Sequence, residues 1–420
     1  MDEALLDAAR SAAGRHVVRE PGGVDDHVDG VVPSIVIEPD STGSAAATLA
    51  WASRARLSVV VRGGGTRDRW GRAPRGVDVL VRLNRLNRIV AHEPGDLTAT
   101  VEAGATLEAV NAALARHGQR LPLDGVVHTS GTIGGLLATN DIGPLRHRHG
   151  TARDLVLGMT FVFGDGLLAS AGGRVVKNVA GYDLARMMTG SFGTLGVIAS
   201  ATFKLTPIPP ASRTVRAVLR RPSDAMALAD QLGKAHVEAE SLEVAVGNTP
   251  HVTVLARLAS VPAAVEDACR QVVRIAQDLD GEVVALPGDE ERVAWGEHAT
   301  MWRTAADRTV LRVSWAPSTL DKAVGDLRQA AGDVRVMLAG RLAVGSGTVT
   351  LDGDIDKHPT IVTRLRESQV LHHVTIVDAP AGVRRAIDPW HVDADTASLW
   401  RALKTACDPH DTLGAGRGPV

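Results

Sequence analysis

Three glycines recur at every third position near the middle of the chain, and this run limits what the surrounding sequence can fold into. Gly190, Gly193 and Gly196 lie within the stretch Arg174–Ile198. Glycine weakens the interior of a helix or a strand, so the run is predicted to be a turn between regular elements. A backbone without Cβ atoms can approach a flat ligand closely and offer its N–H groups. A tight structural turn explains the same glycines equally well.

The residues on either side of this run indicate how it is held. Asp183 is predicted to cap a short helix over residues 184–188, and Gly190 is predicted to end it. Residues 197–205 are predicted to form a strand. The expected order is therefore helix, glycine turn and strand, with the backbone of the turn facing a ligand.

The composition excludes several classes of protein. The chain has 420 residues, of which 45% are hydrophobic and 22% charged, as expected for a globular protein of two or three domains. A net charge of -2 gives no basic excess, so nucleic acid is not an expected partner. No apolar run is long enough to span a bilayer, and the acidic N-terminus lacks the pattern of a signal peptide, which favours a cytoplasmic location. The two cysteines, Cys269 and Cys407, are too few to hold an iron–sulfur cluster.

Two further glycine loops precede the run. Residues 62–66, Arg-Gly-Gly-Gly-Thr, follow a predicted strand at 57–61, and residues 131–135 read Gly-Thr-Ile-Gly-Gly. The first loop lacks the third glycine of a Rossmann motif, and the chain contains no P-loop. Its consecutive N–H groups nevertheless suit a pyrophosphate. Three such loops before residue 205 predict a long ligand bound across one domain.

Prolines at positions 207, 209 and 210 mark the clearest domain boundary. Before it, residues 121–150 are rich in loop-forming residue types, and residues 155–163 and 167–170 are predicted to pair as a hairpin. Beyond it, the order of strands and helices predicts an α+β unit whose helices lie on one side of an antiparallel sheet.

Taken together, these motifs resemble a known family. VVVRGGGT, SGTIGGLLATN, HGTARDLVLG, GGRVVKNVAGYD and GSFGTLGVI occur in this order before residue 205. They are similar to the FAD-binding domain of the vanillyl-alcohol-oxidase (PCMH-type) superfamily, and especially to the FAD-binding subunit of bacterial glycolate oxidase. The resemblance implies an α+β fold with a PCMH-type FAD-binding domain of two α+β subdomains at residues 29–209. It also implies an α+β substrate or cap domain with an antiparallel sheet at 210–393, and a C-terminal helix and tail at 394–420 that returns to the FAD domain.

The resemblance also implies which residues bind FAD. The first loop would cradle the pyrophosphate, the second would line the flavin and its ribityl chain, and the run at 193–198 would contact the isoalloxazine or the adenine through its backbone. Thr66 and Arg67 occupy the region where covalent relatives place a histidine, so the FAD is expected to be noncovalent. The expected cofactor-binding residues are Arg62, Gly63, Gly64, Gly65, Thr66, Gly131, Thr132, Ile133, Gly134, Gly135, Thr139, Asn140, Thr151, Arg153, Asp154, Lys177, Asn178, Gly181, Tyr182, Gly193, Thr194, Gly196, Val197 and Ile198.

Three residues are candidates for catalysis. Tyr182, the single tyrosine of the chain, either lies beside the flavin or is a core aromatic with a bonded hydroxyl, and we favour the core position. Arg146 could bind a substrate carboxylate together with Arg148 and His149, although a solvated loop explains these residues equally well. Lys177 could place positive charge near the flavin.

The sequence departs from catalytic members of the family at several positions. Phe192 stands where those relatives carry a glutamate, and their histidine-containing metal segment is absent. His147 and His149 are expected to be surface or loop residues, and no metal site is expected. The ending CDPHDTLGAGR is similar to the C-terminal ending of the family, and Arg417 could return to the flavin domain.

The resemblance implies an FAD-dependent oxidoreductase subunit that oxidises glycolate or a related 2-hydroxy acid. The flavin would take a hydride from the α-carbon while a base takes the hydroxyl proton. Electrons would pass to a partner, such as a catalytic flavin subunit or an iron–sulfur subunit, and any association with a membrane would be through such partners. The alternatives are a non-catalytic FAD-binding, electron-relay or assembly subunit, and a stand-alone flavin alcohol or sugar oxidase.

Overall fold

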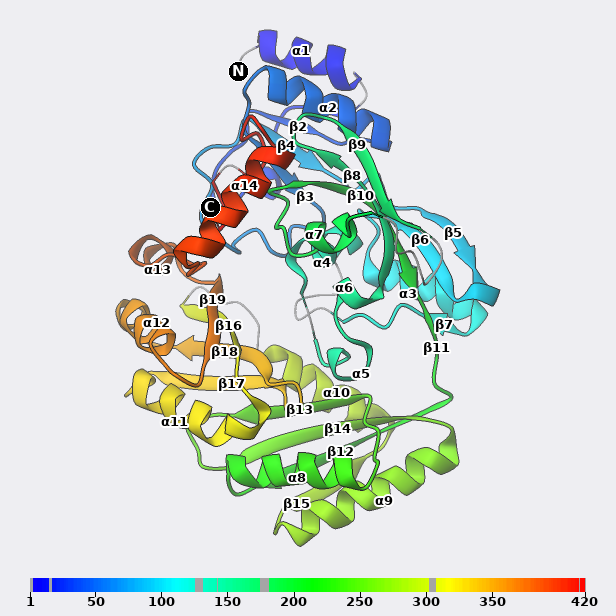
Figure 1. Ribbon diagram of the computed structural model, residues 1–420, viewed down its shortest axis with the longest axis vertical. Helices are drawn as coiled ribbons and strands as arrows, with labels where there is room; N and C mark the ends of the chain where they lie inside the picture. The colour runs from blue at the N-terminus through cyan, green and yellow to red at the C-terminus, as the bar shows by residue number, and fades with distance from the viewer. Residues whose placement is uncertain are drawn as a thin grey trace. The chain divides into compact units, whose positions relative to one another are not determined.

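The chain divides into two compact units. The computed structural model describes residues 3–14, 17–124, 131–141, 143–173, 181–301, 307–414 and 416–419. The first unit comprises Met1–Ile142, Thr151–Ile208 and Val392–Val420, and the second comprises Gly143–Gly150 and Pro209–His391. Both units combine helices with sheets that are mainly antiparallel, which confirms the α+β class (Figure 1).

A four-stranded sheet forms one half of the first unit. Its spatial order is β1 (Val18–Arg19), β2 (Ile35–Ile37), β4 (Val79–Arg82) and β3 (Val59–Arg62), and β4 pairs in parallel with both neighbours. The central strands are rich in valine and isoleucine because both faces of a parallel sheet are covered. The helices α1 (Glu3–Ala13) and α2 (Thr42–Arg54) pack against each other and add Leu6 and Leu49 to the core.

A five-stranded antiparallel sheet forms the other half of this unit. Its order is β5 (Ile89–Glu93), β6 (Thr98–Glu102), β10 (Gly196–Lys204), β8 (Val156–Phe163) and β9 (Leu168–Gly172), and β8 and β9 form the predicted hairpin. The side chains of Phe161 in β8 and Phe203 in β10 are fully buried. The remaining elements of the first unit are η2 (Val24–Asp26), η3 (Pro94–Asp96), α3 (Leu107–Leu114), η4 (Ala115–His117), β7 (Gln119–Arg120), α4 (Ile133–Thr139), α6 (Ala152–Leu155), α7 (Leu184–Met188), β11 (Thr206–Pro207) and α14 (Ala394–Cys407).

The order of helix, glycine turn and strand predicted around Gly193 is confirmed. The Asp183 side chain accepts a hydrogen bond from the backbone N–H of Arg186 at the start of α7, and Gly190 follows the helix with φ of 89°. The segment at residues 121–150, which is rich in loop-forming residue types, also contains α4, a helix that the sequence did not predict. Thr132 caps α4, and Gly134 packs so closely on Ala103 that a Cβ atom there would lie 2.8 Å from the alanine Cβ.

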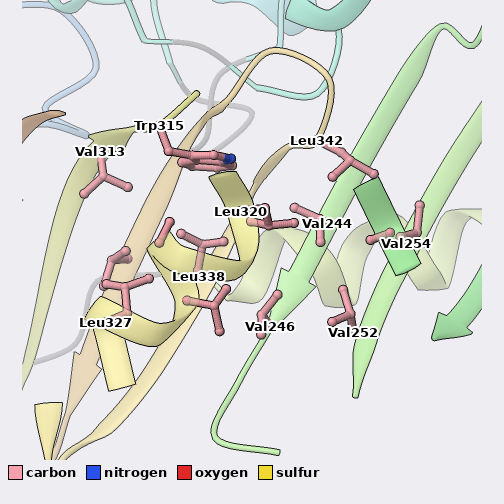
Figure 2. Close-up of a cluster of buried hydrophobic side chains, with 14 of the residues drawn as sticks. Val244, Val246, Val252, Val254, Val313, Trp315, Leu320, Leu327, Leu338 and Leu342 are labelled. Carbon is pink, nitrogen blue, oxygen red and sulfur yellow. The ribbon is translucent and has the colours of Figure 1, made fainter. Parts of the chain in front are cut away.

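The second unit is built on one eight-stranded antiparallel sheet. The helices α8, α9, α11 and α12 contribute to a core on one face of it, as predicted. In Figure 2, Val244 and Val254 from neighbouring strands lie in this core with Leu320 of α11. The strands are, in spatial order, β15 (Glu282–Leu286), β12 (Ala211–Leu219), β14 (Val252–Ser260), β13 (Ser241–Val246), β17 (Arg335–Arg341), β18 (Ser346–Asp352), β16 (Arg308–Ser314) and β19 (His372–Asp378). The helices are α5 (Arg146–His149), α8 (Pro222–Lys234), α9 (Pro262–Asp278), α10 (Gly288–Thr300), η5 (Pro317–Thr319), α11 (Leu320–Ala331), η6 (Ile355–Lys357), α12 (His358–Arg366) and α13 (Ala381–Ala386).

One helix of this unit, α10, was not predicted from the sequence. Trp295 of α10 donates a hydrogen bond from Nε1 to the Thr214 hydroxyl at 2.8 Å. Thr214 precedes Val215, which faces the core, and neighbouring residues of a strand point to opposite faces. The helix therefore lies on the face opposite the main core, which departs from the expected one-sided arrangement.

The C-terminal segment is part of the first unit. The backbone N–H of Val59 donates to the Thr412 carbonyl at 2.7 Å, and that of Gly414 donates to the Val59 carbonyl at 2.9 Å, so the tail runs beside β3. Lys404 of α14 donates from Nζ to the carbonyls of Thr194 and Leu413 at 3.0 and 2.8 Å. The tail is thereby tied to both the strand before the first glycine loop and the glycine turn before β10.

Candidate functional site

A cavity opens in the first unit where the loop after β3 meets the start of α4 and the turn before β10. It encloses about 850 Å³, including its open mouth, which lies within the usual range for ligand pockets. Thirteen of the residues expected from the sequence to bind the cofactor line it: Arg62, Gly63, Gly64, Gly65, Thr66, Thr132, Gly134, Gly135, Thr139, Gly193, Gly196, Val197 and Ile198. The three glycine loops, which are far apart in the sequence, therefore face one hollow.

A second hollow adjoins the cavity. It shares the loop residues 62–65 with the first, together with Asp68 and Thr132, and its other lining residues include the polar Arg82 and Asn84. The loop after β3 thus lies at the junction of two adjoining lobes. This arrangement suits an elongated ligand whose middle portion binds the loop.

The loop after β3 offers unpaired backbone donors. Among the described residues, the N–H groups of residues 63–66 donate to no acceptor. A Cβ atom at Gly63 would lie 2.0 Å from the Thr132 hydroxyl oxygen, and Gly65 has φ of 72°. Both positions therefore require glycine, and the consecutive free N–H groups form a nest for an anion.

The charged side chains of the wall form two close ion pairs. An Nη2 atom of Arg62 lies 2.5 Å from the Asp68 carboxylate, and that of Arg67 lies 2.5 Å from the buried carboxylate of Asp141. Burial raises the pKa of Asp68, against the opposing effect of Arg62 and Arg417. Arg417 reaches the same wall from the C-terminal tail. The wall therefore carries more positive than negative charge.

An aromatic pair covers another side of the cavity. The ring of Trp70 lies 6.4 Å from that of Phe192, and the guanidinium of Arg67 lies 5.5 Å from the Trp70 ring centre. Phe192 has φ of 56°, a conformation that is costly for a bulky residue. Its backbone N–H donates to the Ala138 carbonyl at 2.8 Å, which helps to hold it there. The strained residue therefore presents an aromatic surface to the cavity, suited to a flat ring.

Some of the expected cofactor-binding residues do not line the cavity. Thr151 and Asp154 form the capping box of α6, and Arg153 donates to the Arg186 carbonyl at 2.8 Å. The others that lie outside the wall are Gly131, Ile133, Asn140, Gly181, Tyr182 and Thr194. Lys177 and Asn178 lie outside the described residues.

Tyr182 requires a correction. Its side chain is 92% exposed, so the interpretation as a core aromatic was wrong. It precedes α7, whose capping residue Asp183 is itself at the surface. Tyr182 is not among the described residues that line the cavity.

Nine residues that line the cavity were not among the expected binding residues. They are Val61, Arg67, Asp68, Trp70, Leu83, Ala103, Ala138, Phe192 and Arg417. Arg67, Asp68 and Trp70 closely follow the first loop, and Phe192 directly precedes Gly193. The position of these four residues next to the glycine motifs could have indicated that they line the cavity. Arg417 could not be found in this way, because its position depends on the path of the C-terminal tail.

Arg146 belongs to the second unit and is not among the residues that line the cavity. It donates from Nη1 to the Ser346 hydroxyl at 3.1 Å, and the neighbouring Arg148 pairs with Glu238 at 3.1 Å. His149 lies 3.6 Å from Glu240, with only 12% of its side chain exposed. The expectation that the histidines of this segment are surface or loop residues was therefore wrong, because α5 packs against β13.

His147 of α5 makes the second unit sensitive to pH. Burial lowers its pKa, Glu243 opposes this effect and Arg148 adds to it. An unfolded histidine, with a pKa near 6.5, then binds protons more readily than the folded one, so stability is lost as the pH falls below about 6.5. We expect the melting temperature to decrease between about pH 7.5 and pH 5.5.

The variant His147→Gln should reduce this decrease without removing it. His358 of the same unit also has a pKa lowered by burial, so part of the pH dependence remains. Thermal melts of both proteins at the two pH values provide the measurement. Equal slopes in the wild type and the variant would contradict the assignment to His147.

The described residues also contain no group of three His, Cys, Asp or Glu side chains arranged to hold a metal ion. Over the same part of the chain, none of the helices is both apolar and long enough to traverse a bilayer.

Comparison with known proteins shows an FAD-binding domain in the first half of the chain. Residues 33–172 match the family model described as FAD binding domain. The chain is 37% identical over 183 residues to D-2-hydroxyglutarate dehydrogenase of Xanthomonas citri pv. viticola, a match that covers 44% of this chain and 39% of that protein. It is 39% identical over 162 residues to glycolate oxidase subunit GlcE of Escherichia coli, covering 38% and 46% of the two chains.

A longer alignment is found at lower identity. Glycolate oxidase subunit GlcD of Bacillus subtilis is 27% identical over 422 aligned positions, which cover 92% of this chain and 89% of that protein. The more identical matches span less than half the length of the relatives concerned.

Solved structures show the fold. The structure of 4-ethylphenol oxidase from Gulosibacter chungangensis superimposes with a TM-score of 0.74 at 16% identity, covering 99% of this chain and 97% of that one. The cavity itself suits FAD. Its free N–H groups and net positive charge suit a pyrophosphate, and its aromatic side suits a flat ring. Residues 33–172 thus match an FAD-binding domain, and the chain shares its fold with 4-ethylphenol oxidase.

Proposed function

We propose that the protein is an FAD-dependent oxidoreductase, or a subunit of one, that oxidises glycolate or a related 2-hydroxy acid. The observation that carries the proposal is the two-lobed cavity of the FAD-binding domain, with its free N–H groups at the junction. The similar proteins named above include a D-2-hydroxyglutarate dehydrogenase and two glycolate oxidase subunits, all named for 2-hydroxy acids.

Different residues of the cavity would bind different parts of the cofactor. The N–H groups of residues 63–66 would bind the pyrophosphate, and Trp70 and Phe192 would exclude water from a flat ring. When bound, FAD supplies hydride transfer from the carbon that bears the hydroxyl group. Among the described residues, those that line the lobe with Trp70 and Phe192 include neither histidine nor cysteine, which supports noncovalent binding.

Transfer of electrons to a partner is a further part of the proposal. Burial raises the pKa of Cys269 and of Cys407, which favours the thiol over the thiolate that ligates metals. Two cysteines cannot hold a four-cysteine cluster. We propose that electrons leave to a separate flavin or iron–sulfur subunit in the cytoplasm.

A non-catalytic relay or assembly subunit is the second candidate. The similarity to GlcE of Escherichia coli supports it, since that protein is itself named as a subunit of a glycolate oxidase. Phe192 in the cavity wall also supports it, because an aromatic ring cannot exchange protons with a substrate.

Anaerobic addition of substrate to the purified chain separates the two candidates. We expect glycolate, D-lactate or D-2-hydroxyglutarate to bleach the visible band of bound, oxidised FAD. A band that persists with every acid, in a protein that dithionite still reduces, would favour the relay subunit. Absence of FAD after gentle purification and failure to bind added FAD would contradict both.

A further inference from the structure

The glycine turn before β10 separates two cavities of the first unit. Gly193 and Gly196 line the cavity in which we place FAD. Thr194 and Leu195 line a different cavity, of about 880 Å³ with its open mouth, which is also lined by Lys404 of α14. The turn is therefore a thin wall, and contacts from the side of α14 fix where its glycines lie.

Lys404 holds this wall from the side of the helix. Its Nζ donates to the Thr194 carbonyl at 3.0 Å, to the Leu413 carbonyl at 2.8 Å and to the Asp408 carboxylate at 2.5 Å. A lysine ammonium has three N–H donors, so these three acceptors match its full capacity. The carboxylate of Asp411 lies 3.2 Å from the same atom. With only 15% of its side chain exposed, Lys404 is thus fixed in one place.

The end of α14 gives Lys404 a rigid base. The fully buried carboxylate of Asp408 accepts the backbone N–H groups of Thr412 and Leu413 at 3.0 and 2.7 Å. The backbone N–H of Gly164, in the loop between β8 and β9, donates to the Cys407 carbonyl at 2.9 Å. The end of the helix is therefore attached both to the tail and to the five-stranded sheet.

Displacement of the turn would leave a mostly buried N–H of Lys404 without its acceptor, which costs free energy. We propose that Lys404 is a positioning residue of the FAD site, which holds the glycine turn in place for the cofactor through the Thr194 carbonyl. Among the described residues that line the FAD cavity, none belongs to α14, so the helix acts on FAD through the turn and the tail. The inference rests on FAD binding in this cavity and not on which acid is oxidised.

The first test compares Lys404→Met with the wild type, in the whole chain, after removal of FAD. FAD rebinding is measured by quenching of flavin fluorescence, at a temperature at which thermal melts show each apo-protein to be folded. We expect Lys404→Met to weaken FAD at least about tenfold, because the turn loses the charge-assisted hydrogen bond that holds it in the position FAD requires. Unchanged affinity would overturn the proposal.

Two controls separate positioning from stability. Arg401→Met removes an exposed positive charge from the same helix and should leave the FAD affinity within about twofold of the wild type. Leu6→Ala truncates a buried side chain of α1, which contributes no residue to the cavity wall. It should lower the melting temperature but also leave the affinity within about twofold. If Leu6→Ala weakens FAD as much as Lys404→Met does, loss of stability explains both effects and the proposal is overturned.

Hydrogen exchange of the wild type provides a second test, which needs no variant. Coupling between two sites is reciprocal, so FAD must stabilise α14 if Lys404 links this helix to the turn. We expect FAD to slow amide exchange in α14 more than in α2, which likewise contributes nothing to the cavity wall, and this difference should disappear in Lys404→Met. Equal slowing of both helices in the wild type would overturn the proposal even if Lys404→Met fails to fold. A wild type that binds no FAD would contradict the proposed function as well, whereas the other adverse outcomes contradict only the role of Lys404.

Discussion

The variant Gly63→Ala is expected to purify without bound FAD while its second unit remains folded. The new Cβ atom would lie 2.0 Å from the Thr132 hydroxyl oxygen and 3.1 Å from its Cβ. Thr132 cannot simply turn aside, because its hydroxyl accepts from the Gly135 N–H and caps α4. The two glycine loops must therefore separate, which disrupts the N–H groups that we propose bind the pyrophosphate. Loss of two charge-assisted hydrogen bonds is worth roughly 3 kcal/mol or more, or about a hundredfold in affinity.

Flavin absorbance of the purified protein and titration with FAD provide the measurement. Gly76→Ala is the matched control, since a Cβ atom at that position meets nothing within 4 Å and Gly76 belongs to the same unit. It should bind FAD like the wild type. Normal FAD content in Gly63→Ala would show that the junction of the two loops does not hold the cofactor.

The second large effect is expected from Asp141→Asn. The side chains of Asp141 and Arg67 are 1% and 7% exposed, and the substitution leaves the guanidinium buried without its negative partner. Breaking one half of a buried ion pair costs about 3–5 kcal/mol. For a unit of this size, the melting temperature should fall by roughly 10 °C. FAD affinity should also fall, because Arg67 lines the cavity.

Two comparisons keep this prediction specific. The double variant Arg67→Met with Asp141→Leu removes both charges and should recover much of the lost stability. Arg270→Gln removes a surface pair with Asp267, whose side chains are 69% and 58% exposed, and should change stability by less than about 1 kcal/mol. Thermal melts of the apo-proteins measure all three. A loss for Asp141→Asn no larger than that for Arg270→Gln would refute the structural role of the pair.

The sequence predicted the parts of the site that depend on residue type. Gly63 and Gly65 belong to a glycine cluster that is recognisable in the sequence. Other residues are excluded there by the close contact of Gly63 with Thr132 and by the positive φ of Gly65. The helix α4 was missed for the same reason: Gly134 and Gly135 in its first turn look like a loop, and only the close contact with Ala103 explains them.

Features that depend on distant contacts could not be predicted. Arg67 and Asp141 are 74 positions apart, and neither residue type indicates that they pair. The left-handed backbone of Phe192 is set by its neighbours, since phenylalanine itself disfavours it. The helix α10 is polar on most sides and contains glycine, so it lacks the periodic apolar pattern from which a helix is recognised.

The tail at β3 has a consequence for how the protein is made. The first unit is discontinuous, and its last piece, Val392–Val420, follows the entire stretch Pro209–His391 of the second unit. At ribosomal rates of about 5–20 residues per second, roughly 10–40 s pass between synthesis of the glycine loops and synthesis of the tail. The cavity wall is therefore completed only after the second unit has been synthesised, and stable FAD capture is expected to follow synthesis of Val392–Val420.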